Sequence, residues 1–331
     1  IISLLHPGLS CVQITVMHFR LGLLAIALAA ASFAQVKLKQ TTDRISVEID
    51  GKPFTEFFIG TDVPKPYLHP LRTAGGKTVS RSFPMDVVEG EAKDHPHHRG
   101  LWFTHGLVNE IDFWANEKNQ KGAGTNGRGI VVTRRITAVD SGKKKGVIGA
   151  NFAWQDLKGN TLLDEVRSMT FYSHPTERWI DFDITLTAAA AVTFGDTKEG
   201  MFAIRLTTDL EEKHTGKMRT ADGKVGEKAV WGKRSPWVDY AGNVSGEALG
   251  VAIFDHPANP RHPTYWHSRS YGLFAANPFG VHDFENDKTK NGEMKLAPGE
   301  KLRFRYRLVI HPGDAETAKL ADNYKKWAAA K

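Results

Sequence analysis

Cysteine is nearly absent from this chain: Cys11 is the only one among 331 residues. A disulfide within the chain needs two cysteines, so the sequence excludes this kind of cross-link. No cysteine follows residue 34, which excludes a thiolate nucleophile and thiolate metal ligands from the rest of the chain. Stability must therefore come from a hydrophobic core, and a chain of this length can bury a large one.

Long apolar runs are also scarce. The apolar run at residues 21–31 is shorter than the roughly 20 residues that a membrane-spanning helix needs. It follows Arg20 and ends in small residues typical of a signal peptidase site. We predict that residues 17–34 form a signal peptide, that residues 1–16 are an upstream extension foreign to the native protein, and that residues 35–331 form one domain. An N-terminal membrane anchor is the alternative. No later stretch has the length of a membrane span, so we expect a periplasmic or secreted protein.

The formal net charge is +7, but the basic residues are scattered along the chain. This distribution is typical of a solvated surface, and we expect no nucleic-acid partner. The sequence also lacks a Gly-X-Ser-X-Gly motif, a lysine-containing phosphate loop and a dinucleotide-binding fingerprint. It therefore does not support the chemistries that these motifs serve.

Alternation of apolar and polar residues, the pattern of a strand with one buried face, dominates the chain. It is clearest at Arg44–Asp50, where Ile45, Val47 and Ile49 share one face and Asp50-Gly51 is a two-residue hairpin signal. Similar patterns occur at residues 130–139, 146–155, 162–172, 179–186, 202–207, 249–254 and 302–310. We predict an all-β fold, specifically a large antiparallel β-sandwich.

One helix is predicted, at the C-terminus. Asp314 can cap it, and an apolar stripe at helical spacing follows, formed by Ala318, Ala321, Tyr324 and Trp327. We expect this helix to pack on a sheet edge.

Two regions, residues 64–105 and 231–280, resist assignment to strands outside 249–254. Two short windows, together with His105 just after the first, hold seven of the twelve histidines that follow residue 34. Loops that keep such side chains commonly carry function.

The first window is Asp94-His95-Pro96-His97-His98-Arg99-Gly100-Leu101-Trp102. Imidazole is the natural acid or base near neutral pH, guanidinium binds sugar or carboxylate oxygens, and an indole can lie against a sugar face. If the backbone is extended here, His95 and His97 share one face and His98 points away.

The second window runs from Phe254 to Arg269 and contains His256, His262 and His267. Its prolines stiffen the loop and lower the entropy cost of ordering it. Further candidates lie on either side of this window: Trp237, Asp239, Tyr271 and Asn277.

These residues predict an enzyme that acts on a sugar or glycoside as an epimerase, lyase or hydrolase, with two imidazoles transferring protons. The candidate catalytic residues are His97, His98, His256, His267 and Asp239. The candidate substrate-binding residues are Arg99, Trp102, Trp237, Arg269, Tyr271 and Asn277. Each has a structural alternative: a hydrogen-bonded histidine, a core tryptophan, or a carboxylate that caps a turn.

Two other functions fit the same residues. The first is a metal-dependent enzyme or metal-binding protein, in which the histidines hold zinc or copper. The His-X-His-His spacing is not a metal signature by itself, so we assign no metal and no other cofactor. The second is a non-catalytic carbohydrate-binding protein, which the number of ionisable groups disfavours.

Both windows resemble a family of bacterial proteins often labelled "methane oxygenase PmoA". The resemblance rests on Pro66-Tyr67-Leu68-His69-Pro70, on the first window, on the stretch from Phe254 to Arg261, and on Trp266-His267-X-Arg269-X-Tyr271-Gly272. The membrane methane monooxygenase subunit is a multi-helix membrane protein, so we take the family membership and not the chemistry of the label.

A second, weaker resemblance links the tail from Leu296 to Leu308 with the closing strands of galactose-mutarotase-like sandwiches. Such sandwiches place histidines and a carboxylate on a concave face to act on sugar rings. This resemblance implies the same sandwich fold and a small-molecule sugar as the ligand.

Overall fold

Antiparallel strands make up most of the computed structural model, which describes residues 1–3, 8 and 35–330. The predicted signal peptide and upstream extension therefore lie almost entirely outside the described residues. In the first eight-stranded sheet the order is β1 (Val36–Gln40), β2 (Arg44–Ile49), β3 (Lys52–Phe58), β4 (Tyr67–His69), β5 (Leu101–His105), β11 (Gly200–Arg205), β16 (Leu273–Asn277) and β15 (Tyr265–Trp266).

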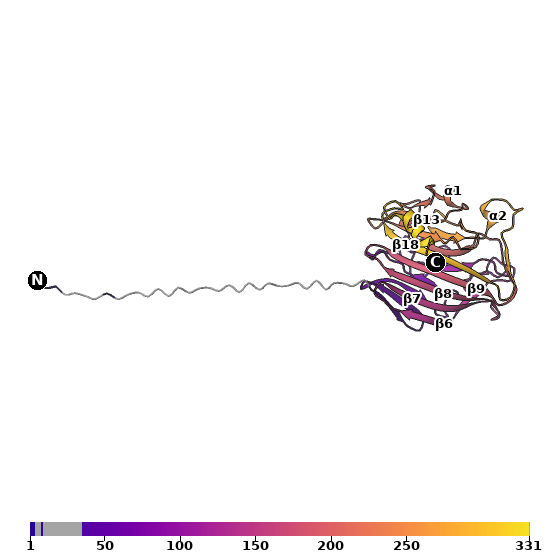
Figure 1. Ribbon diagram of the computed structural model, residues 1–331, viewed down its shortest axis with the longest axis horizontal. Coiled ribbons are helices and arrows are strands. Elements are labelled where there is room, and N and C mark those ends of the chain that lie inside the picture. Colours follow the sequence, from indigo (N-terminus) through magenta and orange to yellow (C-terminus); the bar gives the residue numbers. More distant parts are fainter. Residues whose placement is uncertain (4–7, 9–34, 331) are drawn as a thin grey trace. The chain divides into compact units, whose positions relative to one another are not determined.

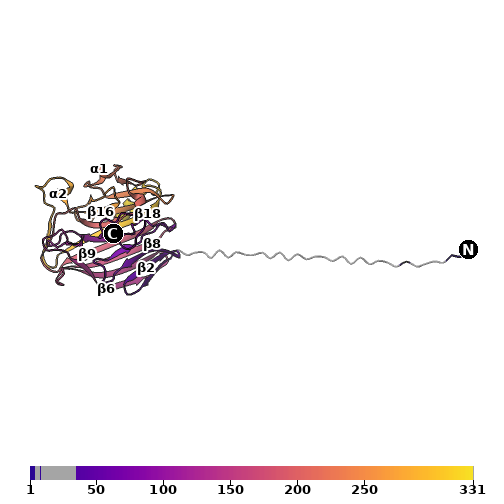
Figure 2. The same cartoon turned by 180° about the vertical axis from the view of Figure 1, so that it is seen from behind.

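The second eight-stranded sheet has the order β12 (Lys217–Thr220), β13 (Trp237–Val244), β14 (Glu247–Asp255), β18 (Lys301–Pro312), β9 (Arg178–Ala188), β8 (Thr161–Ser173), β7 (Lys145–Gln155) and β6 (Ile130–Asp140). Figure 1 shows β18, β9, β8, β7 and β6 following one another across it, and Figure 2 shows β2 and β16 of the first sheet from behind. The remaining elements are the pair β10 (Val192–Phe194) and β17 (Met294–Leu296), the 3-10 helix η1 (Thr208–Leu210), α1 (Glu227–Val230), α2 (Val281–Phe284) and α3 (Leu320–Ala328).

The hairpin at Asp50-Gly51 joins β2 to β3 as predicted, with Ile49 paired to Lys52. Both loop residues have positive φ, 53° at Asp50 and 76° at Gly51, as the tight hairpin turns that match strand twist require. Ile45, Val47 and Ile49 are buried on one face of β2. The alternating side chains therefore set the face that β2 turns to the core.

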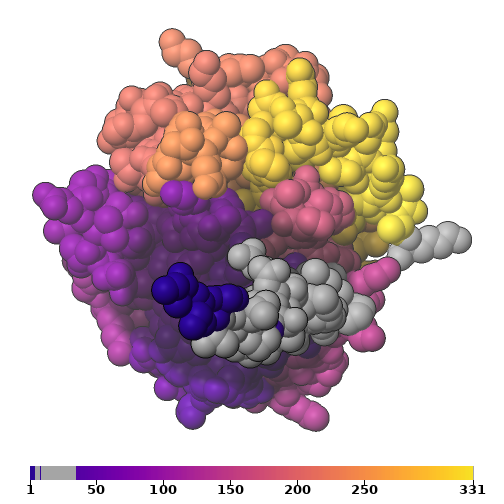
Figure 3. All heavy atoms as spheres, turned by 90° about the vertical axis from the view of Figure 1, so that its left-hand side faces the viewer, coloured from indigo at the N-terminus to yellow at the C-terminus, as the bar shows by residue number. Residues whose placement is uncertain are grey.

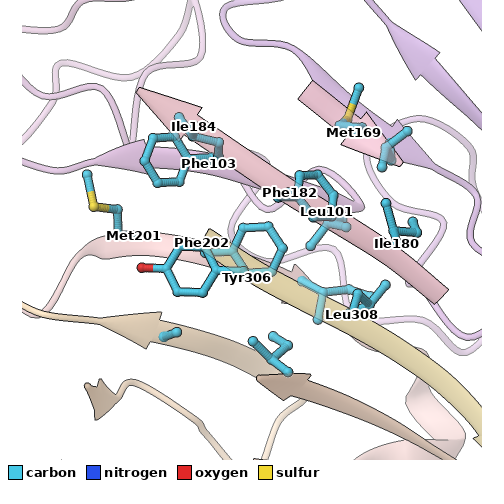
Figure 4. Packing of buried hydrophobic residues seen from close by; sticks show 14 of the residues in the cluster. Leu101, Phe103, Met169, Ile180, Phe182, Ile184, Met201, Phe202, Tyr306 and Leu308 are labelled. Carbon is cyan, nitrogen blue, oxygen red and sulfur yellow. The ribbon is translucent and has the colours of Figure 1, made fainter. Parts of the chain in front are cut away.

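The core lies between the inner faces of the two sheets. Phe202 of the first sheet stacks on Tyr306 of the second at 4.6 Å between ring centroids, and packs edge-on against Phe182 at 4.8 Å. Figure 4 shows these rings meeting between the strands, with Phe103 nearby. Burying a side chain of this size contributes roughly 1.5–3 kcal/mol, so the layer between the sheets is the main source of stability.

All eight predicted strands are present, and the predicted β-sandwich class is confirmed. The expectation that residues 64–105 and 231–280 lack strands outside 249–254 is wrong, because β4, β5, β13, β15 and β16 lie there. Every residue of β5 and of β16 is buried. A strand covered on both faces has no polar face, so its sequence does not alternate and escapes detection.

The C-terminal helix is present but differs from the prediction. Asp314 accepts a hydrogen bond from the Thr317 backbone N–H at 2.9 Å in a separate turn, and the helix begins only at Leu320, after Lys319 at φ 50°. Ala321 is exposed. The helix packs on the outer face of the second sheet, against residues of β13, β14 and β18, and not on an edge. In Figure 3 the C-terminal part, in yellow, gathers at one side of the surface.

None of the helices in the described residues is long and apolar enough to cross a membrane.

Candidate functional site

The first histidine window folds into a tight turn immediately before β5. The His98 backbone N–H donates to the His95 carbonyl at 2.9 Å, with Pro96 at the second turn position, where proline is favoured. Gly100 has φ 50°, and a Cβ there would lie 2.1 Å from the Leu68 carbonyl oxygen, so only glycine fits. The expectation of an extended backbone, with His98 pointing away, is wrong.

The turn gathers the three imidazoles in mutual contact. The His95 ring stacks on the His98 ring at 4.7 Å with an interplanar angle of 8°, and His97 lies edge-on to both. On its other side His95 stacks on Tyr271 at 5.4 Å. His98 in turn stacks on Trp102 at 5.2 Å. His97 and His98 are buried, whereas the His95 side chain is 41% exposed.

This cluster lies on the outer face of the first sheet. Directly paired residues on antiparallel neighbours share a face, and the pairing defines one row across the sheet: Phe58, Tyr67, Trp102, Ala203, Ala275 and His267. The two small alanines separate Trp102 from His267, and Tyr271 packs against this layer. Trp102 is 1% exposed, so it supports His98 from below and does not present a free ring to a sugar.

Two buried arginines from distant segments converge on Asp94. One carboxylate oxygen, Oδ1, accepts from Arg81 at 2.5 Å and from Arg205 at 3.1 Å, and the other, Oδ2, lies 2.9 Å from Nδ1 of His95. Arg205 also approaches Nδ1 of His98 at 3.3 Å, and its guanidinium lies 4.6 Å from the Tyr271 ring centroid. Asp94 therefore links the cationic layer beneath the cluster to its one exposed imidazole.

Arg99 is already engaged within the protein. Its Nε and Nη2 donate to the two oxygens of Glu117 at 2.7 and 2.9 Å. A bidentate pair of this kind satisfies the guanidinium, and it does not support the predicted role of Arg99 in binding substrate oxygens. Nearby, Gln120 Nε2 donates to Nδ1 of His97 at 2.9 Å, which fixes the orientation of that ring.

Burial holds His97, His98 and His267 in their neutral form. Desolvation, with a contribution from Lys65, lowers the pKa of His97 to about 2, and desolvation lowers the pKa of His98 well below its usual value. Burial, then the charges of Lys198 and Arg269, lowers the pKa of His267 to about 3. Neutral imidazoles each offer one hydrogen-bond donor and one acceptor, and their lowered pKa values make them poor proton acceptors at pH 7.

His267 and Arg269 form the opposite side of the same cluster. The Arg269 guanidinium lies 5.9 Å from the centroid of Tyr271 and 5.7 Å from that of Trp231, and the Trp231 ring lies 6.4 Å from His267. Arg269 is about one third exposed and pairs with Glu227 at 3.1 Å. The Arg269 guanidinium, between Trp231 and Tyr271, therefore connects the ring contact of His267 to the turn that carries His95.

Four sequence-predicted residues lie elsewhere. Asp239 is buried in β13 of the second sheet and pairs with His311 at 3.0 Å. Trp237 packs against α3. His256 contacts Trp327 on the outer side of the second sheet. Because the sheets pack by their inner faces, these residues do not join the cluster on the first sheet.

Asn277 is the fourth. It is fully buried, and its side-chain amide donates to the carbonyls of Thr197 and Lys198 at 3.0 and 2.9 Å. Its Oδ1 accepts from the Phe279 backbone N–H at 2.9 Å. These hydrogen bonds make Asn277 a structural residue that holds the loop containing Thr197 and Lys198, and they occupy the side-chain groups that would bind a substrate.

Several residues of the cluster were missed by sequence reasoning: Lys65, Arg81, Trp114, Glu117, Gln120 and Arg205. Lys65 is completely buried, donates to the Trp114 carbonyl at 2.6 Å and to Asn116 Oδ1 at 2.9 Å, and burial lowers its pKa to about 7. Arg205 is central to the site but sits alone in an apolar strand. A charge within an apolar strand is the one signal that could have revealed it.

Within residues 35–330, no group of three or more His, Asp or Glu side chains is arranged to hold a metal ion.

The fold and the cluster together define an antiparallel β-sandwich protein with an imidazole- and arginine-rich site on one outer face. The chain belongs to a family of unknown function, DUF6807, whose model matches residues 44–325. The family description names no activity, so the methane oxygenase label stays a resemblance. A comparison with curated proteins finds no match.

Among solved structures, the chain is similar to a galactose mutarotase-like protein from Clostridium acetobutylicum, with 11% identity, 84% of this chain and 98% of that chain covered, and a TM-score of 0.40. It is similar to galactose 1-epimerase from Lactobacillus acidophilus, with 10% identity, the same coverage and a TM-score of 0.37. The alpha-galactosidase of Lactobacillus brevis has 9% identity and a TM-score of 0.37 over 86% of this chain, which spans 40% of that enzyme's length. The β-sandwich assignment rests on the strands themselves, and these likenesses do not bear on chemistry.

Proposed function

We propose that the imidazole cluster is the active site of an exported enzyme that acts on a sugar or glycoside by proton transfer, as an epimerase, lyase or hydrolase. The observation that carries this proposal is the pair formed by Asp94 and His95. The carboxylate holds Nδ1 at 2.9 Å, and the ring is 41% exposed, so Nε2 remains for a substrate. A carboxylate that fixes one ring nitrogen while the other faces the reactant is an arrangement used in general acid–base catalysis.

The neighbouring residues supply complementary roles. His97 is neutral and its Nδ1 accepts from Gln120, so its Nε2–H remains as a hydrogen-bond donor to a substrate oxygen. His98 lies between His95 and Trp102 and acts as a positioning residue. The exposed edge of Arg269, together with Tyr271, would bind sugar oxygens at the rim. This assignment adds His95 to the sequence-based set and leaves out His256 and Asp239.

Export is part of this proposal, and the support for export is the apolar segment within residues 17–34. A periplasmic or secreted location would place the site in contact with extracellular saccharides.

The test is turnover of a panel of sugars and glycosides by His95→Gln, His97→Ala and His98→Ala variants. General acid–base groups contribute typically 10²–10⁴-fold to rate, so we expect His95→Gln to lose about that much kcat, and His97→Ala to lose turnover because a hydrogen-bond donor to the substrate is missing. The matched control is His174→Gln, at a partly exposed histidine in the turn between β8 and β9 of the second sheet. Unchanged turnover in all three cluster variants would refute the assignment. Saturable sugar binding without turnover would identify a carbohydrate-binding protein instead.

A further inference from the structure

A second cavity lies on the outer face of the opposite sheet, away from the imidazole cluster. Its volume is about 490 Å³, within the range of small-molecule sites. Strands β8, β9 and β18 form its floor, and the C-terminal helix α3 forms one wall. Arg303, Arg305 and Arg307 all line it because alternate residues of a strand point to the same face.

Two of the three arginines are neutralised by neighbouring carboxylates. Arg307 donates to both oxygens of Asp181, at 2.5 and 2.7 Å, and Arg303 makes the same bidentate pair with Asp183. The carboxylates of Asp181 and Asp183 are therefore already paired with Arg307 and Arg303. Arg305 lies between these pairs, and its guanidinium has no hydrogen bond or ion pair with any residue that the structure describes.

The backbone of Arg305 is held firmly although its side chain is not. The Asn259 side chain accepts from the Arg305 N–H at 2.6 Å and donates to its carbonyl at 2.7 Å. His256, whose backbone N–H also donates to that carbonyl, places its ring in the cavity. The backbone of Arg305 is thus fixed at the cavity floor, while its guanidinium makes no hydrogen bond to a described residue.

The cavity carries an excess of positive charge. Lys326 of α3 adds a fourth cation, so among the described residues that line the cavity four basic side chains face two carboxylates. Burial, then the charge of Arg305, lowers the pKa of His256 to about 4, so this imidazole is neutral at pH 7 and adds no charge. A concave surface with this balance attracts anions.

The remaining lining is suited to a sugar ring. Tyr172 and Trp327 contribute aromatic surface, and both rings are held by the Arg307 guanidinium, at 5.4 and 5.6 Å from their centroids. Ser168 and Thr170 contribute hydroxyl groups. An inorganic ion would use only a small part of this mixed polar and apolar surface.

We propose that this cavity is a second binding site, for an acidic saccharide, whose carboxylate or sulfate pairs with Arg305 and Lys326 while its ring lies against Tyr172 and Trp327. The site is independent of the proposed catalytic cluster, because the two occupy the outer faces of opposite sheets. The cavity would bind an acidic unit of a carbohydrate and would take no part in the reaction proposed for the imidazole cluster.

The test is calorimetric titration of the protein, tagged upstream of Gln35 so that the C-terminal residues stay native, with glucuronate, glucose and sodium sulfate. We expect saturable binding of glucuronate that weakens as salt rises, and no binding of glucose. Arg305→Gln should weaken it about ten- to hundredfold, the value of a hydrogen bond to a charged group. Arg305→Lys should restore part of the affinity. Lys39→Gln, which removes the same charge from an exposed site on β1, should leave binding unchanged.

Three outcomes would overturn the proposal: no binding of glucuronate, binding of sulfate alone, or equal affinity in the Arg305→Gln variant. Far-UV circular dichroism would confirm that this variant folds, as expected for a side chain without hydrogen bonds to described residues. Titration of His97→Ala separates the two sites. If glucuronate binds there as in the wild type, this cavity is the site, and if binding is lost, the imidazole cluster holds the anion and the proposal fails.

Discussion

Replacing Asp94 by Asn is the sharpest test of how the imidazole cluster is held together. The substitution keeps the shape of the side chain but removes the charge that faces Arg81 and Arg205, whose side chains are 1% and 0% exposed. Removing one partner of a buried ion pair typically costs about 3–5 kcal/mol. The Asp94 side chain is 41% exposed, so water offsets part of this loss, and we expect a decrease of about 2–3 kcal/mol in the free energy of unfolding at pH 7.

The pH dependence provides an independent check. Burial raises the pKa of Asp94, but the charges of Arg205, His95 and Arg81 outweigh it, so the pKa lies below its ordinary value of 3.8. A lowered folded-state pKa means that the carboxylate stabilises the protein fully above the unfolded pKa. This contribution is lost as pH falls through the folded pKa. The difference between wild type and Asp94→Asn should therefore be constant above about pH 5 and shrink below pH 3.8.

Urea unfolding at several pH values, followed by tryptophan fluorescence, measures both effects. Asp140→Asn, the same change at an exposed carboxylate at the end of β6, is the control and should stay within about 0.5 kcal/mol of wild type. A loss at Asp94 no larger than this control, or a loss that persists undiminished at pH 3, would refute the reasoning. In the activity assay, turnover by Asp94→Asn should fall with that of His95→Gln, since the amide no longer favours the same imidazole tautomer.

Two further predictions concern the second sheet. Glu165 and Arg167 of β8 form a buried ion pair at 2.6 Å, so Glu165→Gln should lower the free energy of unfolding by about 3–5 kcal/mol. In the same urea experiment, replacing both residues by Met should recover most of this loss. An equal loss in the double variant would contradict the prediction. Burial lowers the pKa of His311, but the charge and hydrogen bond of Asp239 outweigh burial, so the pKa is raised above 6.5. The pair therefore stabilises the protein fully below pH 6.5. This stabilisation is lost progressively as pH rises through the folded-state pKa of His311. The melting temperature of the wild type should consequently fall between pH 5.5 and pH 9 by more than that of Asp239→Asn, and parallel pH profiles would count against the pair.

The sequence was informative wherever a segment has one buried face. The alternation at residues 44–50 predicted both the strand β2 and the face that it buries, and the Asp50-Gly51 turn predicted its partner β3. It was uninformative for β5 and β16, because strands buried on both faces have no polar side to report their orientation.

For the candidate site, the clustering of histidines along the chain pointed to the turn at residues 95–98. It could not show that Arg81 and Arg205, far apart in the sequence, share the Asp94 carboxylate. A buried charge is stable only beside its partner, and that partnership depends on long-range strand pairing, which no local pattern encodes.

The same limit explains the division of the two histidine windows. By itself the sequence determined that the fold is a β-sandwich, that thiol chemistry is excluded after residue 34, and that histidine is the principal candidate for acid–base chemistry. Only the tertiary structure decided that His267 joins His95, His97 and His98 while His256 lies on the far sheet. His256 follows β14 of the second sheet and His267 follows β15 of the first, so the chain crosses from one sheet to the other between them. Each lies on the outer side of its sheet because the inner faces form the core. Neighbours in sequence such as His256 and His267 can therefore end on opposite sides of the protein.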